Sequence, residues 1–317
     1  MGYDHISTGL RRRVDTIARR LISLAGVGII LSIGAIFVFI ALEAYPLLLP
    51  AKAVPIRPFP LAGADPALVV ASDEYRENLL VLRESGVLQV MPSAGGAPSA
   101  EVPLAPSGRV TAAAYHRPRG ELAMALDTGE IRFVRAEFVA TFEGSRRVIR
   151  LESKDEGGRA SLDEGFVARR LAYARGGSGD RVLVAWDPED GLRILRRTET
   201  ETPLGELRSE ESVTDLTKDL PGRLTSLALS SNGIRLVAGF EDGMLHRWDL
   251  GAAEPRHVES VRATAGSDVS VTALGFLIGD RTLVVGDSSG AVSTWLSVRA
   301  PQAPDGWRTT LVHPLRA

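Results

Sequence analysis

Two stretches near the C-terminal end of the chain decide the fold class. Residues 224–250 read LTSLALSSNGIRLVAGFEDGMLHRWDL, and residues 271–297 read VTALGFLIGDRTLVVGDSSGAVSTWLS. A threonine, two glycines and a tryptophan recur in the same order at an offset of 47 residues: Thr225 and Thr272, Gly239 and Gly286, Gly243 and Gly290, Trp248 and Trp295. Four matched positions at one offset identify an internal repeat.

Each copy of the repeat predicts short strands joined by tight turns. Residues 224–229 alternate in the way a half-buried strand does. The pairs Asn232-Gly233 and Asp242-Gly243 suit turns, because these residues tolerate positive φ. Residues 234–240, 244–249 and 256–262 supply the other three strands. Four antiparallel strands in about 40–50 residues make one blade of a β-propeller.

Weaker copies upstream bring the number of predicted blades to five. We interpret the glycines of the recurring hairpins, and the two repeated tryptophans, as structural residues of the blades: Gly86, Gly129, Gly191, Gly243, Gly290, Trp248 and Trp295. Polar inserts at about 143–165 and 197–220 are expected to be solvated loops between blades. The sequence therefore predicts an all-β, WD-repeat-like β-propeller. A helical solenoid, the main alternative, would need apolar stripes of period 3.6, whereas the body shows period-2 runs.

The number of blades in the natural protein stays open. Ring closure in propellers usually borrows a strand from the other end of the chain, and residues 314–317 show no such strand. We expect that the natural protein continues past Ala317 with the ring incomplete here. A closed five-bladed ring is the alternative.

A membrane-spanning helix is predicted ahead of the propeller. Residues 21–42 contain neither charge nor proline, and 22 helical residues span roughly 33 Å, enough for a hydrocarbon core of about 30 Å. Five arginines precede this run, while Glu43 and Pro46 follow it. The excess of positive charge upstream places the N-terminus in the cytoplasm and the remainder across the inner membrane, in the periplasm.

These features divide the chain into four parts. We expect a basic cytoplasmic N-terminus at 1–20, a transmembrane helix at 21–45, a Pro-rich linker at 46–66 and the periplasmic propeller at 67–317. A cleaved signal peptide is the competing interpretation, but the run exceeds the usual apolar core of about 7–15 residues. Gly28, Ser32 and Ala35 fall near one helical face, where they would suit packing against other membrane helices or simply be ordinary membrane-helix residues.

Composition and motifs give little support for chemistry. The chain has no cysteine, a net charge of −2 and no P-loop, so nothing favours thiolate metal sites, nucleic acid as a partner or a bound nucleotide. We predict no catalytic, cofactor-binding or metal-binding residues. The sequence around Ser288 and Ser289 superficially matches a serine-protease motif, but a blade hairpin explains it. Of the five histidines, His246 and His257 form only a loose pair on two strands of one blade.

The order of the parts resembles the N-terminal region of the large permease subunits of bacterial phosphate ABC transporters. The residues behind this resemblance are the basic stretch Arg11–Arg20, the helix after it, residues 44–51 (AYPLLLPA) at its exit, and the blade motifs 241–249 and 287–295. The resemblance covers nearly all of this chain but only the first half of such a subunit. It implies a periplasmic WD-repeat-like insertion and partners that include the lipid bilayer, further permease helices and a periplasmic solute-binding protein or another envelope protein. The transport core and the loop that would couple to an ATPase are absent.

Three functions are compatible with these features of the sequence. The first is the anchor and propeller of a permease for inorganic phosphate, and the second is a free-standing membrane-anchored scaffold for envelope proteins. The third, an extracytoplasmic propeller enzyme, has no supporting constellation of residues.

Overall fold

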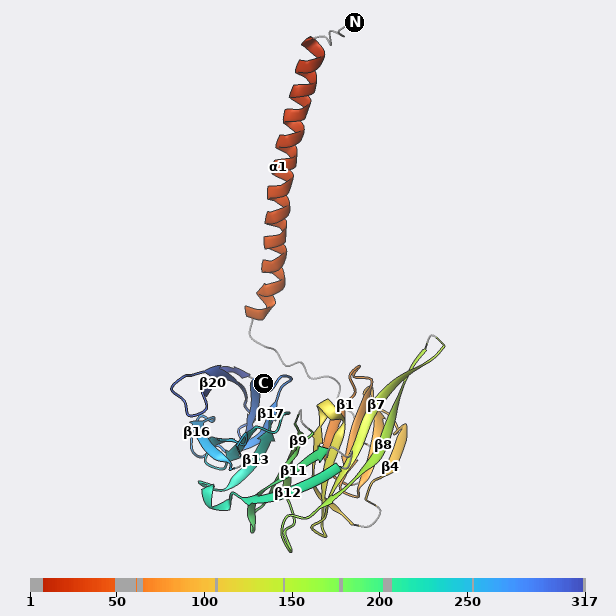
Figure 1. The fold of residues 1–317 in the computed structure, drawn as a ribbon, viewed down its shortest axis with the longest axis vertical. Coiled ribbons are helices and arrows are strands. Elements are labelled where there is room, and N and C mark those ends of the chain that lie inside the picture. Colours follow the sequence, from red (N-terminus) through yellow and green to blue (C-terminus); the bar gives the residue numbers. More distant parts are fainter. Residues whose placement is uncertain are drawn as a thin grey trace. The chain divides into compact units, whose positions relative to one another are not determined.

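The computed structural model describes residues 8–48, 61, 65–105, 108–144, 146–176, 179–201, 207–252 and 254–315. The chain divides into two compact units, Met1–Ala53 and Val54–Ala317. The first contains a long helix, and the described residues of the second form strands, turns and short 3₁₀ turns (Figure 1).

The helix α1 spans Thr8–Ala44 and is followed by a 3₁₀ turn, η1, at Tyr45–Leu48. Leucine, isoleucine and alanine favour the helix, and Pro46 stops it because proline cannot donate the next backbone hydrogen bond. The segment Val14–Ala44 is long and apolar enough to cross a membrane, with a mean hydropathy of 2.6 over its most apolar window, a property that signal sequences share. The helix begins thirteen residues before the uncharged run, so Arg11–Arg13 lie within it.

The second unit consists of five four-stranded antiparallel sheets, each formed by consecutive strands. Blade 1 contains β1 (Ala67–Ser72), β2 (Asn78–Arg83), β3 (Val87–Pro92) and β4 (Ala100–Pro103). Blade 2 contains β5 (Val110–His116), β6 (Glu121–Leu126), β7 (Ile131–Glu143) and β8 (Arg146–Ala160). Blade 3 contains β9 (Arg170–Arg175), β10 (Arg181–Asp187), β11 (Gly191–Glu201) and β12 (Leu207–Asp215).

The last two blades correspond to the two repeat copies. Blade 4 contains β13 (Leu224–Leu229), β14 (Arg235–Phe240), β15 (Met244–Asp249) and β16 (Arg256–Arg262). Blade 5 contains β17 (Val271–Phe276), β18 (Thr282–Asp287), β19 (Val292–Arg299) and β20 (Trp307–Leu315). Three short 3₁₀ turns complete the described elements: η1, η2 (Arg117–Arg119) and η3 (Thr217–Asp219). The predicted all-β, propeller-like architecture is confirmed.

The apolar core lies between the blades. Four buried clusters join blade 1 to blade 2, blade 2 to blade 3, blade 3 to blade 4, and blade 4 to blade 5. The inner strands β1, β5, β9, β13 and β17 adjoin one another in that order (Figure 1). Among the described residues, no such cluster joins blade 5 to blade 1.

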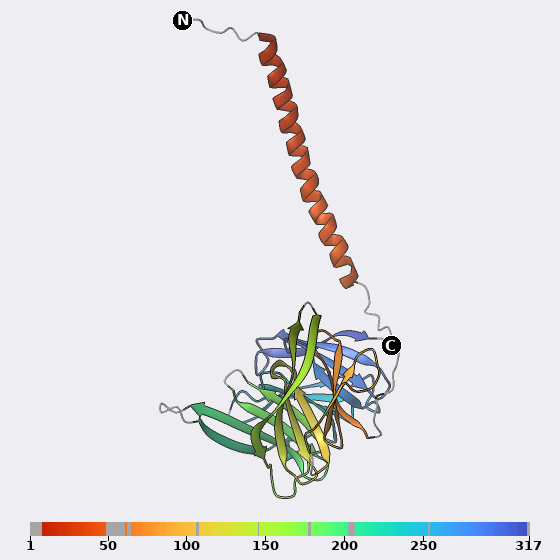
Figure 2. The ribbon, with the colours of Figure 1, turned by 90° about the vertical axis from the view of Figure 1, so that its right-hand side faces the viewer.

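The expectation that the two polar inserts form loops was wrong. The insert containing Lys154–Gly158 belongs to β8, which pairs with β7 from Ile131↔Ala160 to Glu143↔Arg146. The insert containing Thr198–Glu201 belongs to β11, which pairs with β12. Both hairpins extend beyond the rest of their sheets (Figure 2). Outer strands are wetted on both faces where they project, so polar and charged residues can occupy them and conceal the period-2 apolar pattern.

Candidate functional site: the turn face of the propeller

The hairpin glycines lie at the turns that join the second and third strands of their blades. The φ angles of Gly86, Gly129, Gly191, Gly243 and Gly290 are 78°, 80°, 86°, 79° and 84°. The N–H of Gly243 donates to the carbonyl oxygen of Phe240 at 3.1 Å, and Gly290 bonds Asp287 in the same way. A residue with a Cβ would be strained in this left-handed conformation. These glycines therefore shape the blades and carry no chemistry.

The two repeated tryptophans lie in the core between blades. Trp248 is 1% exposed and belongs to the cluster joining blades 3 and 4, and Trp295 is 5% exposed in the cluster joining blades 4 and 5. Their large buried area contributes to packing between neighbouring sheets.

A pocket of about 300 Å³ lies among the five inner strands. The first residues of the inner strands line it, and small side chains such as Thr111, Ser226 and Ala273 keep it open. Arg169 and Arg170 bring positive charge to it, and Arg169 lies 3.9 Å from the carboxylate of Asp187.

The other ends of the inner strands carry a buried polar cluster. Glu121 on β6 is 1% exposed. It accepts a hydrogen bond from the Tyr173 hydroxyl at 2.6 Å and forms an ion pair with Arg175. His116, at the end of β5, lies edge-on to the Tyr173 ring and its Nε2 is 2.9 Å from the carbonyl oxygen of Ser231 in blade 4. The cluster thus connects three blades. It lies at the opposite ends of the inner strands from the residues that line the central pocket.

Burial and pairing set the charge states in this cluster. Burial opposes ionisation of Glu121, but the hydrogen bonds from Tyr173 and Arg175 outweigh it, so the pKa of this carboxyl is lowered. Burial also raises the pKa of Tyr173, and its bond to Glu121 raises that pKa further. Burial lowers the pKa of His116. At neutral pH the cluster therefore holds an ionised glutamate beside a protonated tyrosine and a neutral histidine.

We define the turn face as residues 116–121, 230–235 and 277–281 together with Arg175 and Arg181, the ends and turns between the first and second strands of blades 2–5. Ser231 joins blade 4 to blade 5 here, because its backbone N–H donates to Asp280 at 2.9 Å. Arg235 donates to the Ser297 hydroxyl at 3.1 Å and to the carbonyl oxygen of Asp280. Polar contacts between blades therefore recur across this face.

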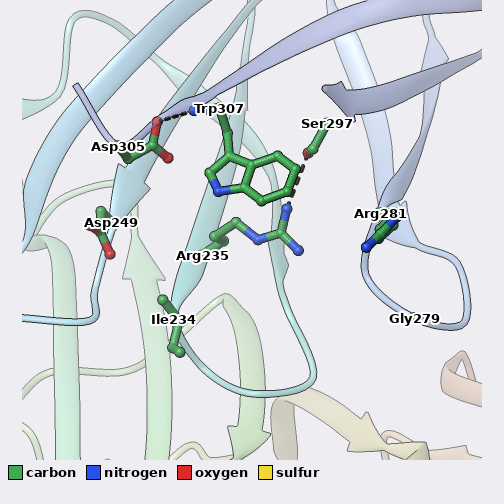
Figure 3. A pocket seen from close by; sticks show the side chains of 8 residues that line it. All are labelled: Ile234, Arg235, Asp249, Gly279, Arg281, Ser297, Asp305 and Trp307. Atoms are coloured by element: carbon green, nitrogen blue, oxygen red, sulfur yellow. Dashed lines mark hydrogen bonds between the residues drawn. The ribbon is translucent and has the colours of Figure 1, made fainter. Parts of the chain in front are cut away.

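A cleft of about 360 Å³ lies between blades 4 and 5 at the turn face (Figure 3). Its lining residues are Ile234, Arg235, Asp249, Gly279, Arg281, Ser297, Asp305 and Trp307. Figure 3 shows the Arg235 guanidinium next to the Trp307 indole, with Arg281 on the opposite side of the cleft. Both acidic groups of the lining are bound elsewhere, Asp249 by Gly251 N–H and Asp305 by Arg247. The cleft thus offers an aromatic surface and arginines, a combination suited to binding an acidic group and not to acid–base chemistry.

Arg247 forms one buried ion pair within blade 4 and one with blade 5. Its side chain is 5% exposed and contacts the carboxylates of Glu259 and Asp305, whose side chains are 15% and 10% exposed. It also donates to the carbonyl oxygen of Trp307 at 2.9 Å, while Glu259 accepts from the Thr309 backbone N–H at 3.0 Å. Every polar group in this network has a partner, which is the condition under which a buried charge is tolerated.

The motif around Ser288 and Ser289 forms a capped turn. Asp287 Oδ1 accepts hydrogen bonds from the Ser289 N–H at 2.9 Å, from the Ser289 hydroxyl at 2.6 Å and from the Ala291 N–H at 3.1 Å. The serine hydroxyl is therefore directed at the aspartate that shapes its own turn.

The structure brings His246 and His257 into contact. His246 Nδ1 and His257 Nε2 are 3.2 Å apart, and the Ser260 hydroxyl lies 3.0 Å and 3.1 Å from these two nitrogens. Within the described ranges, no group of three or more histidine, cysteine and acidic side chains converges. His5 lies outside the described residues.

Neither the Arg247 network nor the Glu121 cluster was among the residues predicted from the sequence. Arg247 and Glu259 face each other across β15 and β16. Once the two strands were assigned, these opposite charges on paired strands could have predicted an ion pair. Glu121, Tyr173 and Ser231 come from separate blades, and their proximity depends on the ring.

Comparisons with known proteins support the fold. No family model matches the chain, and no curated protein matches it. Among solved structures, it is similar to the β-propeller domain of Myceliophteria thermophila Cps50 (Swd1), with a TM-score of 0.50 and 14% sequence identity over 80% of this chain and 73% of that one. Because 1368 solved chains match this one, the similarity establishes the propeller fold and no particular activity.

Proposed function

We propose that this chain anchors a β-propeller to the cytoplasmic membrane and presents it on the outer side as a binding module. The observation that carries the proposal is the helix α1. Every described side chain from Val14 to Pro46 is exposed, although most of them are apolar. A helix that is apolar on all sides is stable only when lipid or other helices surround it.

The distribution of charge along α1 supports this orientation. Arginines 11–13, 19 and 20 precede the apolar segment, whereas the first charge after it is Glu43. Positive residues are retained on the cytoplasmic side, so the propeller would lie on the other side. The rigid ring and the arginine-containing cleft at its turn face then suit recognition of an envelope protein by a binding module.

More specifically, we propose that the anchor and propeller belong to the permease of an ABC transporter for inorganic phosphate. The support is the order of the parts, a basic N-terminus, one helix and a WD-repeat-like domain, together with the basic stretch Arg11–Arg20 and the helix exit at residues 44–51. In this proposal the propeller docks a periplasmic solute-binding protein, and α1 packs against the remaining helices of the permease. This chain contributes docking, and the phosphate pathway lies in the other helices.

The absence of cysteine makes the topology directly testable. We expect that Ser161→Cys, at an exposed position in the propeller, reacts with a membrane-impermeant maleimide in spheroplasts. Ser7→Cys should react only after the membrane is permeabilised. The reverse labelling pattern would refute the orientation, and a mature chain that lacks residue 7 would identify α1 as a cleaved signal sequence.

The permease proposal has a separate test. Reading the gene beyond codon 317 should reveal further propeller sequence followed by several hydrophobic spans. A stop codon with no permease gene nearby would instead support a free-standing scaffold. This result and the labelling result are independent, so one proposal can fail without the other.

A further inference from the structure

A three-residue cluster on the outer part of blade 4 has no role in the functions discussed above. His246 lies on β15, and His257 and Ser260 lie on β16. His246 is half-buried, while His257 and Ser260 are exposed. The three donor atoms form a nearly equilateral triangle with edges of 3.0, 3.1 and 3.2 Å.

A β-bulge creates this cluster. In a regular strand, His257 and Ser260 would point to opposite faces because they are three residues apart. The register between β15 and β16 shifts between Arg247 and Trp248, so that Glu259 faces Arg247, His257 faces Trp248, and Val258 falls between the two pairs. The bulge brings His257 back to the face that carries Ser260 and His246.

The separation of the two nitrogens matches the spacing of metal ligands. Two imidazole nitrogens bound to Zn²⁺ at about 2.0–2.1 Å with a tetrahedral angle lie roughly 3.3 Å apart. The observed distance between His246 Nδ1 and His257 Nε2 is 3.2 Å. A cross-strand histidine pair therefore needs little movement to chelate an ion, and the Ser260 hydroxyl or water can take a further position.

Neighbouring aromatic rings hold the two imidazoles in place. The Phe240 ring contacts His246 edge-on with centroids 4.9 Å apart, and the Trp248 ring is 5.3 Å from that of His257.

We propose that His246 and His257 form a solvent-open binding site for a divalent transition-metal ion, Zn²⁺ or Cu²⁺. Imidazole nitrogen is a preferred ligand of both ions. The two histidines supply two coordination positions, and Ser260 and water supply the others. Because the site is open, a carboxylate or histidine of a docked partner can replace one of the waters.

Copper binding to the full-length chain in detergent micelles tests the site. The protein is purified with an affinity tag that contains no histidine, and Cu²⁺ is followed by electron paramagnetic resonance and by Trp fluorescence. We expect one Cu²⁺ per chain, hyperfine splitting from two nitrogens, and quenching of Trp248, which lies beside His257. Excess Zn²⁺ should displace the copper, whereas Mg²⁺ should not, because it prefers oxygen ligands.

Matched variants distinguish this site from general binding to histidine. His246→Gln and His257→Gln should each weaken Cu²⁺ binding by about 10-fold or more and leave a spectrum with one nitrogen fewer. His313→Gln, on β20 of another blade, should bind like the parent. Circular dichroism and unfolding midpoints verify that the variants fold. Unchanged copper binding in either pair variant, or no saturable binding by the parent, would overturn the proposal.

Discussion

Gly243 shows how strongly one position constrains a blade. Its φ is 79°, and an added Cβ would overlap Thr264 Oγ1 and lie 2.6 Å from the carbonyl oxygen of Val269. Gly290, at the equivalent position of the next blade, has a φ of 84° and nothing within 4 Å of such a Cβ. The two glycines therefore separate the cost of the backbone conformation from the cost of steric overlap.

We expect Gly290→Ala to lower the free energy of unfolding by about 1–2 kcal/mol, the cost of placing a Cβ in the left-handed region. Gly243→Ala should cost about 3 kcal/mol or more, because overlap with Thr264 adds to the same strain. Gly243→Val should be at least as damaging. Urea unfolding of the three variants measures the difference. Equal losses for the two alanine variants would show that overlap at Gly243 contributes nothing.

Removal of Arg247 should destabilise the packing of blade 4 on blade 5. Arg247→Met leaves the carboxylates of Glu259 and Asp305 buried without their cation, which typically costs about 3–5 kcal/mol. Arg223→Gln is the control, because its ion pair with Glu241 is 3.7 Å long and largely exposed, and should change stability by less than about 1 kcal/mol. Urea unfolding measures both variants, and a similar loss for both would contradict the role assigned to burial.

Two carboxyls predict the response of the propeller to acid. Burial opposes ionisation of Asp305 and Glu121, but their arginine and tyrosine partners outweigh it and lower both pKa values. A lowered pKa in the folded state stabilises the protein above the unfolded-state pKa of about 4 and loses that contribution as the pH falls through the folded-state pKa. We expect the urea concentration at the midpoint of unfolding to decrease as the pH falls below about 4. In Asp305→Asn this decrease should be less steep. An unchanged slope in this variant would contradict the argument.

At the scale of elements, blade strands could be predicted closely and the long hairpins could not. The predicted strands 224–229, 244–249 and 256–262 agree with β13, β15 and β16 to the residue. Burial alternates along β13, and the glycine turn at Gly243 marks where β15 begins. The projecting part of β7–β8 is only partly covered, and Phe142 there is 72% exposed. Without burial, no hydrophobic period marks a strand.

The projecting hairpin should therefore be dispensable for folding. Removing residues 140–149 and joining Val139 to Arg150 through Asn-Gly keeps the register, since these two residues pair across β7 and β8. Asn-Gly forms the two-residue turn that matches strand twist. We expect the thermal midpoint to change by less than about 3 °C, measured by circular dichroism, which corresponds to roughly 1 kcal/mol. A larger loss would show that the hairpin contributes to the core.

At the scale of the whole molecule, the outer faces of the first and last blades differ. Val284 in blade 5 is half-exposed, although its counterpart Val237 in blade 4 is 4% exposed against blade 5. In blade 1, Val81 and Met91 are fully buried on the face turned away from blade 2. Sequence repetition predicts that the corresponding faces of all blades are equivalent. It cannot predict which of these faces is covered by other residues.

A pair of matched variants measures how far the last blade is covered. Val237→Asp places a charge in a packed interface and should destabilise the propeller by several kcal/mol, about 3 or more. Val284→Asp, at the equivalent repeat position, should cost less than about 1 kcal/mol because water reaches it. Urea unfolding compares the two. Equal costs would mean that the fifth blade is packed as tightly on its far side as the fourth.

In the candidate site, the residue types could be read from the sequence, but their proximity could not. The arginines and the tryptophan of the cleft are visible in the sequence, but Arg235 and Trp307 are 72 positions apart and meet only through the packing of blade 4 on blade 5. The histidine pair was noticed as a loose spacing. Its geometry depends on the bulge at Val258, and one extra residue leaves no mark on the period of a short strand.

Each of the described sheets is made from four strands that are consecutive in the chain, with none contributed from a distant segment. A blade can consequently complete its own backbone pairing as soon as its last strand has emerged from a ribosome or a translocation pore. Contacts of low sequence separation form early and at little entropic cost. We therefore expect each blade to pair its own strands before it packs on the next, so that unpaired strand edges are exposed only briefly to neighbouring chains.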